Sequence, residues 1–238
     1  MLKKIIRMFT SNSYSSEVER LDPNSSDETY APPVRRIMNL LAYTRENKVS
    51  YSGFNFYTGY HTLEIDGHTF EGQRKPKERF KDLPFSLDGL SVLDVGCNQG
   101  GMLHAFGNIL KAGIGVDYDH KMINVANKIK TFNKHHHLNF YLFNLEDENL
   151  DYLEDFLPES KVDVAFILSI CIWVRNWKDV IVKVKSLSEK LVFESNGKDH
   201  QQSEQIEFLR TQYERVDLIH EKSEDDPTQK QRKLLVCQ

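Results

Sequence analysis

The sequence predicts an α/β fold in which a largely parallel sheet is covered by helices on both faces. From Leu90 onward, five short apolar runs alternate with stretches of helical periodicity. Strands that alternate with helices build parallel sheets through right-handed crossovers. The chain then ends in two strand-like segments with no room for a helix between them. We therefore expect these two segments to pair as an antiparallel hairpin at the edge of the sheet.

Composition limits the classes of protein that the chain can belong to. It has 238 residues, of which 39% are hydrophobic and 28% are charged, which fits one sizeable domain with a smaller appendage. The net charge of -4 argues against non-specific nucleic-acid binding, because such proteins are usually basic. Three scattered cysteines without CxxC spacing favour a reduced, cytoplasmic protein. No apolar run is long enough to span a bilayer, so no stable membrane insertion is expected.

A small helix-and-hairpin appendage is expected over residues 1–85. Pro32 and Pro33 favour the start of a helix, and apolar residues follow at helical spacing up to Leu41. In "TLEIDGHTF", apolar and polar residues alternate around Asp66-Gly67, which is a strong turn signal for a hairpin. One role for this appendage is a lid over a substrate pocket.

The main domain is expected over residues 86–238. Its first five strands are predicted at "SVLDV", "AGIGVD", "LNFYLF", "VDVAFIL" and "KLVFES". The intervening helices are predicted at about 100–111, 119–132, 148–157, 176–187 and 202–212. The terminal hairpin is predicted from "YERVDLIHE" and "RKLLVCQ".

The stretch "VLDVGCNQGG" at residues 92–101 is the strongest functional signal. A dinucleotide-binding loop has glycine at its first, third and sixth positions, but here, with Gly96 as the first position, the third is Asn98. Asp94 lies two residues before the loop, and its carboxylate disfavours a doubly charged pyrophosphate. A Walker-type loop is excluded because no GK[ST] follows.

The next predicted strand ends at Asp117, where a carboxylate can accept hydrogen bonds from both hydroxyls of a ribose. The two motifs together indicate a ligand with a ribose, a cationic group and no pyrophosphate. S-adenosylmethionine has these three features.

At this point "VLDVGCNQGG" followed by "GIGVDYD" resembles the first two motifs of the class I S-adenosylmethionine-dependent methyltransferases. The resemblance covers about Leu90 to Gln238 and includes the spacing of 23 residues from Asp94 to Asp117 as well as the terminal hairpin. It implies a Rossmann-like methyltransferase sandwich, with a seven-stranded mixed sheet of six parallel strands and one antiparallel strand.

The resemblance also implies positions that bind S-adenosylmethionine. The glycine loop would pass under the methionine part and the ribose, Asp117 would hold the ribose hydroxyls, and Tyr118 would pack on the adenine. Asn144 stands where the family often has an acid that reads the adenine amino group, and Ser169 would face the sulfonium. These positions are Asp94, Gly96, Cys97, Asn98, Gly100, Asp117, Tyr118, Asn144, Leu145 and Ser169, and Arg74 is a further candidate for cofactor binding on other grounds.

Substrate contacts are expected in "ICIWVRNW", because the family places substrate after the fourth strand. Ile170 would face the substrate, and Arg175 could meet an anionic one. Trp173 and Trp177 are four residues apart, so both could line one face of a helix. Packing in the core explains the two tryptophans equally well.

The basic segment "GQRKPKERFK" at residues 72–81 has two interpretations. It could be a solvated linker, or Arg74 or Arg79 could pair with the cofactor carboxylate or with a phosphate on the substrate, since arginine binds such groups in a bidentate manner. Tyr57 and Tyr60 in the preceding segment could cap the pocket, although aromatic residues there could equally dock the appendage on the domain.

No metal site is expected. The run "KHHHL" at residues 134–138 is interpreted as a solvated loop, because adjacent histidines on extended chain point in different directions. Cys97 has no histidine partner in the sequence that would indicate a nucleophile, so we interpret it as part of the loop.

These patterns predict an enzyme that transfers a methyl group in line to an oxygen or nitrogen of a small metabolite. A hydroxyl acceptor needs a base, for which His61 and Glu194 are the candidates, whereas an anionic acceptor needs none. Modification of tRNA is an alternative, since "YHTLEIDGHTFEGQRKPKERFKDL" loosely resembles the segment before the glycine motif of tRNA wobble-uridine carboxymethyltransferases. A further alternative is a non-catalytic partner subunit with the same fold.

Overall fold

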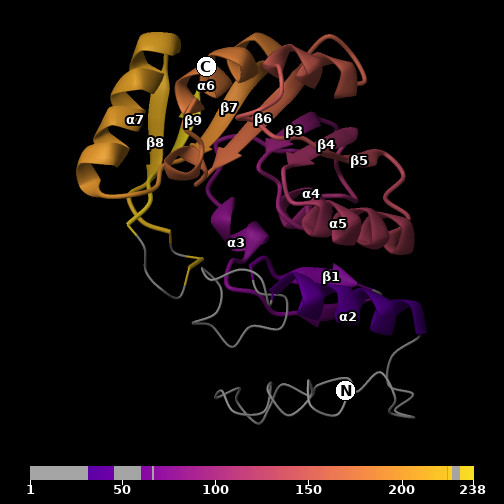
Figure 1. Ribbon diagram of the computed structural model, residues 1–238. Helices are drawn as coiled ribbons and strands as arrows, with labels where there is room; N and C mark the ends of the chain where they lie inside the picture. Colours follow the sequence, from indigo (N-terminus) through magenta and orange to yellow (C-terminus); the bar gives the residue numbers. More distant parts are fainter. Residues whose placement is uncertain (1–31, 46–59, 66, 224, 227–230) are drawn as a thin grey trace.

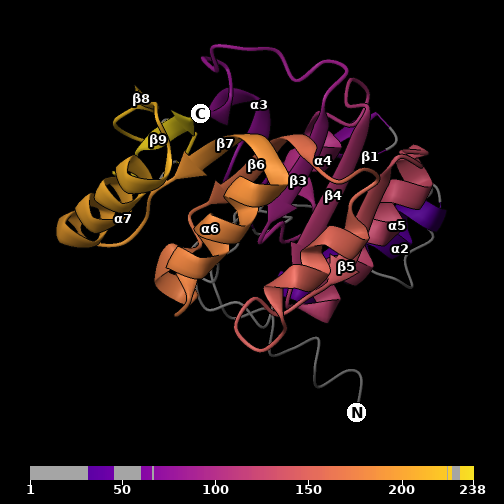
Figure 2. The ribbon, with the colours of Figure 1, turned by 90° about the horizontal axis from the view of Figure 1, so that it is seen from above.

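The computed structural model describes residues 32–45, 60–65, 67–223, 225–226 and 231–238. Within them, seven strands form one sheet in the order β5-β4-β3-β6-β7-β9-β8 (Figures 1 and 2). The strands from β5 to β7 pair in parallel, and β9 pairs antiparallel with both β7 and β8. The predicted sheet of six parallel strands and one antiparallel strand is therefore confirmed. The strands are β3 (Ser91–Val95), β4 (Ala112–Asp117), β5 (Leu138–Leu142), β6 (Val162–Leu168), β7 (Ser188–Glu194), β8 (Val216–His220) and β9 (Leu234–Cys237).

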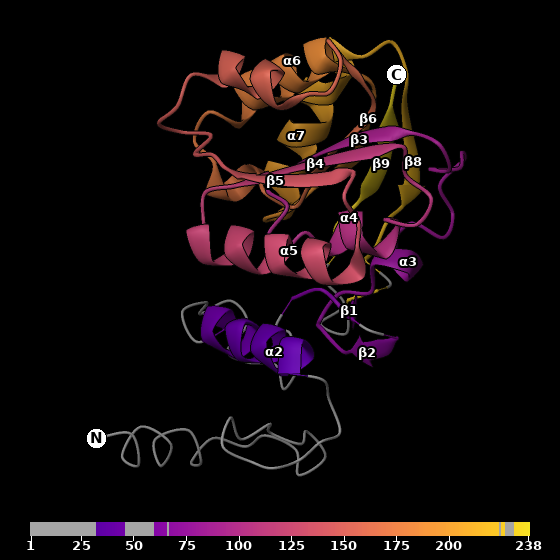
Figure 3. The same cartoon turned by 90° about the vertical axis from the view of Figure 1, so that its right-hand side faces the viewer.

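Helices cover both faces of this sheet, as Figure 3 shows with the sheet seen edge-on. One face carries α4 (Gly101–Ala105) and α5 (His120–Asn133), and the other carries α6 (Trp177–Leu187) and α7 (Asp199–Gln212). Two shorter 3-10 helices, η3 (Leu150–Phe156) and η4 (Cys171–Trp173), follow β5 and β6. The helix predicted at 100–111 is shorter than expected, because glycine and asparagine follow Phe106 and both lower helix propensity.

The sheet separates two hydrophobic cores, which explains why its central strands are apolar throughout. All five residues of β3 are buried. Val92 packs in the core under α4 and α5, whereas the next residue, Leu93, packs in the core under α6 and α7. This alternation follows from the period of two in a strand. Consequently the strand cannot shift by one residue without exchanging the two cores.

The appendage adds a further layer outside α5. Helix α2 (Pro32–Arg45) begins at the predicted prolines, and the predicted hairpin forms as β1 (Leu63–Ile65) and β2 (His68–Phe70), with the short α3 (Pro76–Arg79) after it. Apolar side chains of α2 and β1 form a third core with Val125 and Ile129 of α5. The predicted helix and hairpin are therefore confirmed, while the role of the appendage as a lid stays a prediction.

Candidate functional site

The glycine loop joins the end of β3 to the start of α4 in a conformation that only certain residues adopt. Gly96 and Gly100 have positive φ angles of 78° and 69°, and Asn98 has a φ angle of 53°. Asparagine is one of the few residues with a side chain that tolerates this region. A Cβ atom on Gly96 would lie 2.7 Å from Cγ2 of Ile170, and one on Gly100 would collide with a ring in the core. Both glycines are thus required by conformation and by space.

Asp117 connects this loop to the next turn. One of its carboxylate oxygens accepts a hydrogen bond of 2.9 Å from the backbone N–H of Asn98, and the other accepts one of 2.9 Å from the N–H of Asp119. The strand pairing explains the contact, because Val95 and Val116 lie opposite each other and both strands end at the same edge. The carboxylate of Asp117 thus lies at the end of β4 beside the glycine loop, which is where the ribose is expected.

Asp94 lies beneath the loop and is 2% exposed. Its Oδ2 atom has no hydrogen-bond partner among the described residues. The pKa of Asp94 is raised to about 7, mainly by burial and also by the charge of Asp117, with Arg79 acting in the opposite direction. A buried carboxylate oxygen without a hydrogen-bond partner is costly, so this position fits a cationic group supplied by a ligand. The residues present therefore fit the ammonium and the ribose of S-adenosylmethionine.

A second buried carboxylate, Glu194, lies two strands away at the end of β7. It accepts hydrogen bonds from Arg74, at 2.7 and 3.2 Å, and from Arg79, at 2.5 and 3.1 Å. Arg74 also donates to Asp225 at 2.7 and 2.8 Å. The hydroxyl of Ser169, which follows β6, donates to Glu194 as well. We call Arg74, Arg79, Glu194 and Asp225 the arginine–carboxylate cluster.

The arginine–carboxylate cluster is sealed from water, which decides the charge state of Glu194. Arg74, Arg79 and Glu194 are 0%, 4% and 1% exposed. Burial acts to raise the pKa of Glu194, but Arg74 and Arg79 outweigh it and hold the pKa well below its ordinary range. A carboxylate held so firmly in its charged form is a poor proton acceptor. The prediction of Glu194 as a general base is therefore corrected, since the side chain anchors two arginines.

His61 lies between the arginine–carboxylate cluster and the glycine loop. It is 3% exposed, and its ring packs so closely on Gly101, at the start of α4, that a Cβ atom there would collide with it. Burial lowers the pKa of His61 well below its ordinary value, and the charges of Arg79 and Arg74 lower it further. The imidazole is therefore neutral near pH 7, and of the two candidate bases His61 is the one that can still accept a proton.

A model of the family described as "Methyltransferase domain" matches residues 86–231, which is more than half of the chain. The chain belongs to this family of class I methyltransferases. The sequence matches no curated protein.

Three solved structures illustrate the fold of this methyltransferase. The N-terminal domain of EvdMO1, solved with SAH bound, aligns with a TM-score of 0.60 at 11% identity over 88% of this chain and 99% of that chain. EvdMO1 aligns with a TM-score of 0.58 at 12% identity, and the bifunctional kinase-methyltransferase WbdD with 0.52 at 17% identity. The alignments cover 86% and 84% of this chain, but only 47% and 45% of those chains. The chain thus spans less than half the length of EvdMO1 and WbdD, and these likenesses show the fold.

The basic segment of the methyltransferase is not a solvated linker at its two arginines. Arg74 and Arg79 are buried and point into the domain, where carboxylates occupy both guanidinium groups. The expected pairing of these arginines with a cofactor carboxylate or a substrate phosphate is therefore corrected. Lys77 in the same segment is exposed and pairs with Glu64. Burial of Arg74 and Arg79 fastens the appendage to the domain.

The predicted adenine contacts are only partly brought together. Tyr118 follows β4 and is 66% exposed, so its ring is open to a ligand. Asn144 uses its amide within its own loop, where it donates to Asp147 at 2.6 Å and accepts from the N–H of Glu146 at 3.0 Å. This geometry gives Asn144 a role in holding the loop. The side chain of Leu145 packs in the core, so only its backbone could contact a ligand.

The tryptophans predicted on one helix face lie on different elements. Trp173 ends the 3-10 helix η4 and is 71% exposed, whereas Trp177 begins α6 and packs edge-to-face on Phe208. The prediction of a shared face is wrong, because the chain leaves helical geometry between the two residues. Arg175 is exposed and pairs with Glu146 at 3.0 Å.

The remaining predicted contacts lie around the loop and the appendage. Ile170 packs against Gly96, and the thiol of Cys97 is buried in the core under α4, as befits a loop residue. Tyr60 packs its ring on His61 with ring centroids 4.5 Å apart. Tyr57 lies outside the described residues.

The histidine run is a structural feature and not a solvated loop. His135 is buried, and its ring stacks on His104 of α4, with the two Nδ1 atoms 3.4 Å apart. Nε2 of His104 bonds to the carbonyl of Ala126, and Nε2 of His137 bonds to the carbonyl of Gly107 at 2.7 Å. Burial lowers the pKa of His104 to about 3, and His135 lowers it further. The neutral ring of His104 therefore connects α4 to α5 through its bond to Ala126.

Four polar residues near the arginine–carboxylate cluster were missed by sequence reasoning. Asp226 accepts two hydrogen bonds of 3.2 Å from the amide of Gln73, and Arg232 reaches Ser169 and Glu194. One signal could have found Arg232. An antiparallel strand begins at the edge where its parallel neighbours end, so the residues before β9 must lie beside the end of β7. The missed residues are Gln73, Asp225, Asp226 and Arg232.

Proposed function

We propose that this methyltransferase uses S-adenosylmethionine and transfers its methyl group to an oxygen or nitrogen of a small metabolite. The observation that carries the proposal is Asp94, a buried carboxylate under the glycine loop whose Oδ2 has no partner among the described residues. Burial without a partner favours a ligand with a positive charge at this position. The SAH-bound state of the EvdMO1 domain, which has the same fold, is consistent with such a ligand.

The residues that would hold the cofactor come from two neighbouring turns. Asp94 would meet the ammonium group, the loop from Gly96 to Gly100 would pass beneath the methionine part, and Asp117 would accept from the ribose hydroxyls. Tyr118 would cover the adenine with its exposed ring. When bound, S-adenosylmethionine supplies a methyl group on a sulfonium, which is already a good leaving group. The chain then contributes mainly by holding the acceptor in line with that methyl group.

The state of the two candidate bases favours an acceptor that is already anionic. Glu194 is bound by two arginines, and His61 is neutral but has a lowered pKa, which makes it a weak base. A carboxylate or phosphate acceptor needs no proton removed before transfer. A hydroxyl acceptor would instead depend on His61.

Calorimetric titration with S-adenosylmethionine tests the proposal. We expect the wild type to bind and Asp117→Ala to bind roughly 10- to 100-fold more weakly, because hydrogen bonds to a charged group contribute about 1.5–3 kcal/mol. Asp88→Ala, at an exposed aspartate outside the site, is the matched control and should bind like the wild type. A wild-type protein that binds NAD and ignores S-adenosylmethionine would contradict the proposal.

Two alternatives are tested separately. The tRNA hypothesis loses support because Arg74 and Arg79 are buried and do not form a basic surface. Co-purifying nucleic acid with steeply salt-dependent binding would restore it. For the non-catalytic subunit, the decisive measurement is turnover of S-adenosylmethionine to S-adenosylhomocysteine with fractionated metabolites, since turnover rejects that alternative.

Location in the cell is also a proposal. Among the residues that the structure describes, no helix has both the length and the apolar character needed to cross a membrane. We propose a cytoplasmic location, which is supported by three cysteines that are all free and buried.

A further inference from the structure

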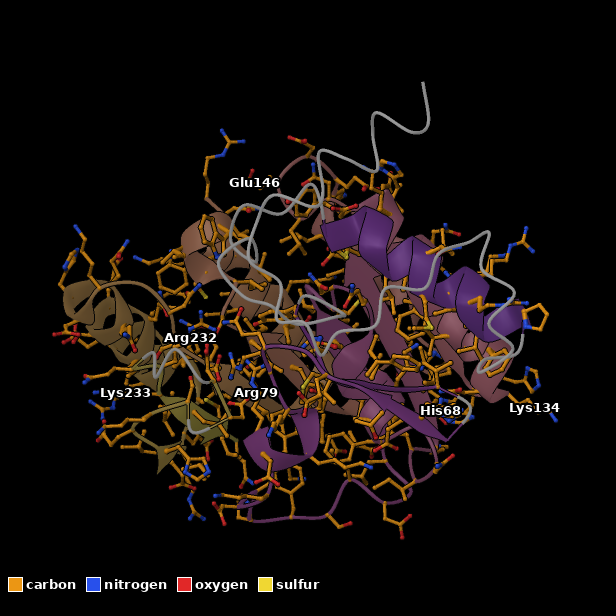
Figure 4. All side chains as sticks on the ribbon, turned by 90° about the horizontal axis from the view of Figure 1, so that it is seen from below. His68, Arg79, Lys134, Glu146, Arg232 and Lys233 are labelled. Atoms are coloured by element: carbon orange, nitrogen blue, oxygen red, sulfur yellow. The ribbon has the colours of Figure 1, made fainter. Side chains whose placement is uncertain are left out.

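Arg232 is a cation that the topology brings to the site. It lies two residues before β9, and β9 runs antiparallel to β7 with Leu234 opposite Glu194. The start of β9 therefore meets the carboxyl ends of β6 and β7. Arg232, from the segment before β9, and Arg79, from α3, both reach Oε2 of Glu194, and the two residues are labelled near each other in Figure 4.

The backbone on both sides of Arg232 is held in place. The carbonyl of Gln231 accepts a hydrogen bond of 2.7 Å from the side chain of Gln202. Lys233 exchanges two hydrogen bonds of 2.9 Å with Ser195, through its N–H and its carbonyl. The backbone that carries the guanidinium is thus held in place, which lowers the conformational entropy that the side chain loses when it binds a ligand.

The contacts of Arg232 within the described residues are long and few. Its Nη1 lies 3.4 Å from the Ser169 hydroxyl and 3.7 Å from Glu194. A guanidinium carries five N–H donors, so most of them are not used by these contacts. The side chain is 14% exposed, so, unlike Arg74 and Arg79, it is not sealed from water.

Glu194 does not need Arg232 as a hydrogen-bond donor. Its two oxygens already accept four hydrogen bonds from Arg74 and Arg79, and a further one from Ser169. A carboxylate offers about four positions for such bonds, so Glu194 is saturated without Arg232. The other acids of this region are engaged too, since Asp225 bonds to Arg74 and Asp226 bonds to Gln73.

The position of Arg232 relates it to the glycine loop. Ser169, which Arg232 touches, precedes Ile170, and Ile170 packs directly on Gly96. An anion on Arg232 would therefore lie next to the residue that covers the loop. Under the proposed function, an anion held there would lie beside the loop that binds the cofactor.

We propose that Arg232 binds an oxyanion of the acceptor, so that the substrate of this methyltransferase is a small carboxylate or phosphate compound. That the anion belongs to a methyl acceptor rests on the proposed function, but anion binding by Arg232 can be tested without the cofactor. Arginine suits the role because its planar fork matches the oxygens of a carboxylate or a phosphate.

The test is an NMR titration of the full chain with inorganic phosphate and, in a second arm, with acetate, at constant ionic strength. The readout is the saturable shift of the backbone amide signals of Ser169 and Ser195. We expect one of the two anions to saturate the wild type, and the arm that saturates assigns the anion as a phosphate or a carboxylate. Arg232→Gln should raise the dissociation constant roughly tenfold or more, with Arg232→Lys in between. Lys233→Gln removes the adjacent positive charge and should leave binding unchanged.

Two results would overturn the inference: no saturable shift in the wild type with either anion, or equal binding by the wild type and Arg232→Gln. If Arg232→Gln does not fold, an Arg232→Lys variant that binds as tightly as the wild type also counts against it. Titration of each variant with S-adenosylmethionine separates the two proposals. If Arg232→Gln loses anion binding but binds S-adenosylmethionine like the wild type, both proposals are supported. If the wild type binds the anion through Arg232 but does not bind S-adenosylmethionine, the anion site is supported and only the cofactor assignment is refuted.

Discussion

Asp94 and Glu194 are both buried carboxylates of the same sheet, yet their surroundings shift their pKa values in opposite directions. Oδ2 of Asp94 has no partner among the described residues, and burial raises its pKa to about 7. Glu194 is equally buried, but Arg74 and Arg79 keep its pKa well below the ordinary range. The difference teaches that burial alone does not define a functional acid. We propose that Asp94, whose Oδ2 lacks a partner among the described residues, meets a ligand, whereas Glu194, which is paired with arginines, holds the structure.

The largest expected effect comes from breaking the partnered acid. Glu194→Gln leaves Arg74 and Arg79 buried without their shared countercharge, so we expect the free energy of unfolding to fall by about 3–5 kcal/mol. Urea denaturation measures this change. Glu189→Gln, at an exposed position of the same strand, is the control and should change little. A loss below about 1 kcal/mol for Glu194→Gln, as expected of surface ion pairs, would contradict the proposed role of the cluster.

Removing the charge of the other acid should have the reverse effect on stability. The folded protein raises the pKa of Asp94 from its usual value to about 7, so the folded state binds more protons than the unfolded state between about pH 4 and 7. This contribution to stability is present at low pH and is lost as the pH rises through 7. Asp94→Asn should therefore be more stable than the wild type at pH 8, by up to about 4 kcal/mol without ligand.

The same Asp94→Asn variant should bind S-adenosylmethionine more weakly, which sharpens the contrast between the two acids. Thermal unfolding at pH 5 and pH 8 and calorimetry at pH 8 measure the two effects. Asp88→Asn is the control for both. A variant that loses stability at pH 8 and keeps full cofactor affinity would show that Asp94 is a structural acid like Glu194.

The buried histidine pair extends the comparison to a base. Burial lowers the pKa of His104 to about 3, so only the unfolded state gains a proton as the pH falls from about 6.5. The stability from this residue is present above pH 6.5 and is lost toward pH 3, by about 2 kcal/mol between pH 7 and pH 5. His104→Gln should flatten this part of the stability profile, which denaturation at several pH values measures. An unchanged slope of stability against pH in His104→Gln would contradict a lowered pKa for His104.

The smallest effect is expected at an exposed ion pair. Arg175 and Glu146 form a bond of 3.0 Å at the surface, where water screens the charges. Arg175→Gln should therefore leave the midpoint of thermal unfolding unchanged, in contrast to the buried arginines. Once an acceptor is known, the same variant tests the predicted substrate contact, because a rise in KM without a change in stability would support it.

Contacts made within a short stretch of chain could be predicted, whereas those between distant stretches could not. The glycine loop, Asp94 and Asp117 belong to two consecutive strand-and-turn units, so their spacing alone predicted a site. Arg74 and Glu194 are 120 residues apart, and Arg74 and Asp225 are 151 apart. No local pattern could indicate that these three residues share one buried cluster.

Errors of interpretation arose where one sequence pattern fits two environments. A basic segment can be solvated or buried, and only the carboxylates supplied by β7 and by the segment before β9 decided that Arg74 and Arg79 are inside. The spacing of Trp173 and Trp177 fits one helix, but the backbone between them is not helical. The histidine run suggested a solvated loop, because the stacking partner of His135 lies in α4, far away in the sequence.

The sequence by itself determined the order of strands and helices, the glycine loop and the family, because hydrophobic period, turn residues and motif spacing are local properties. Only the tertiary structure decided which charges are paired. The sheet brings the ends of β3, β6 and β7 and the start of β9 to one edge, where burial makes every charge need a partner. At that edge Glu194 is saturated by arginines, while Asp94 and Arg232 keep bonding capacity that the described residues do not use.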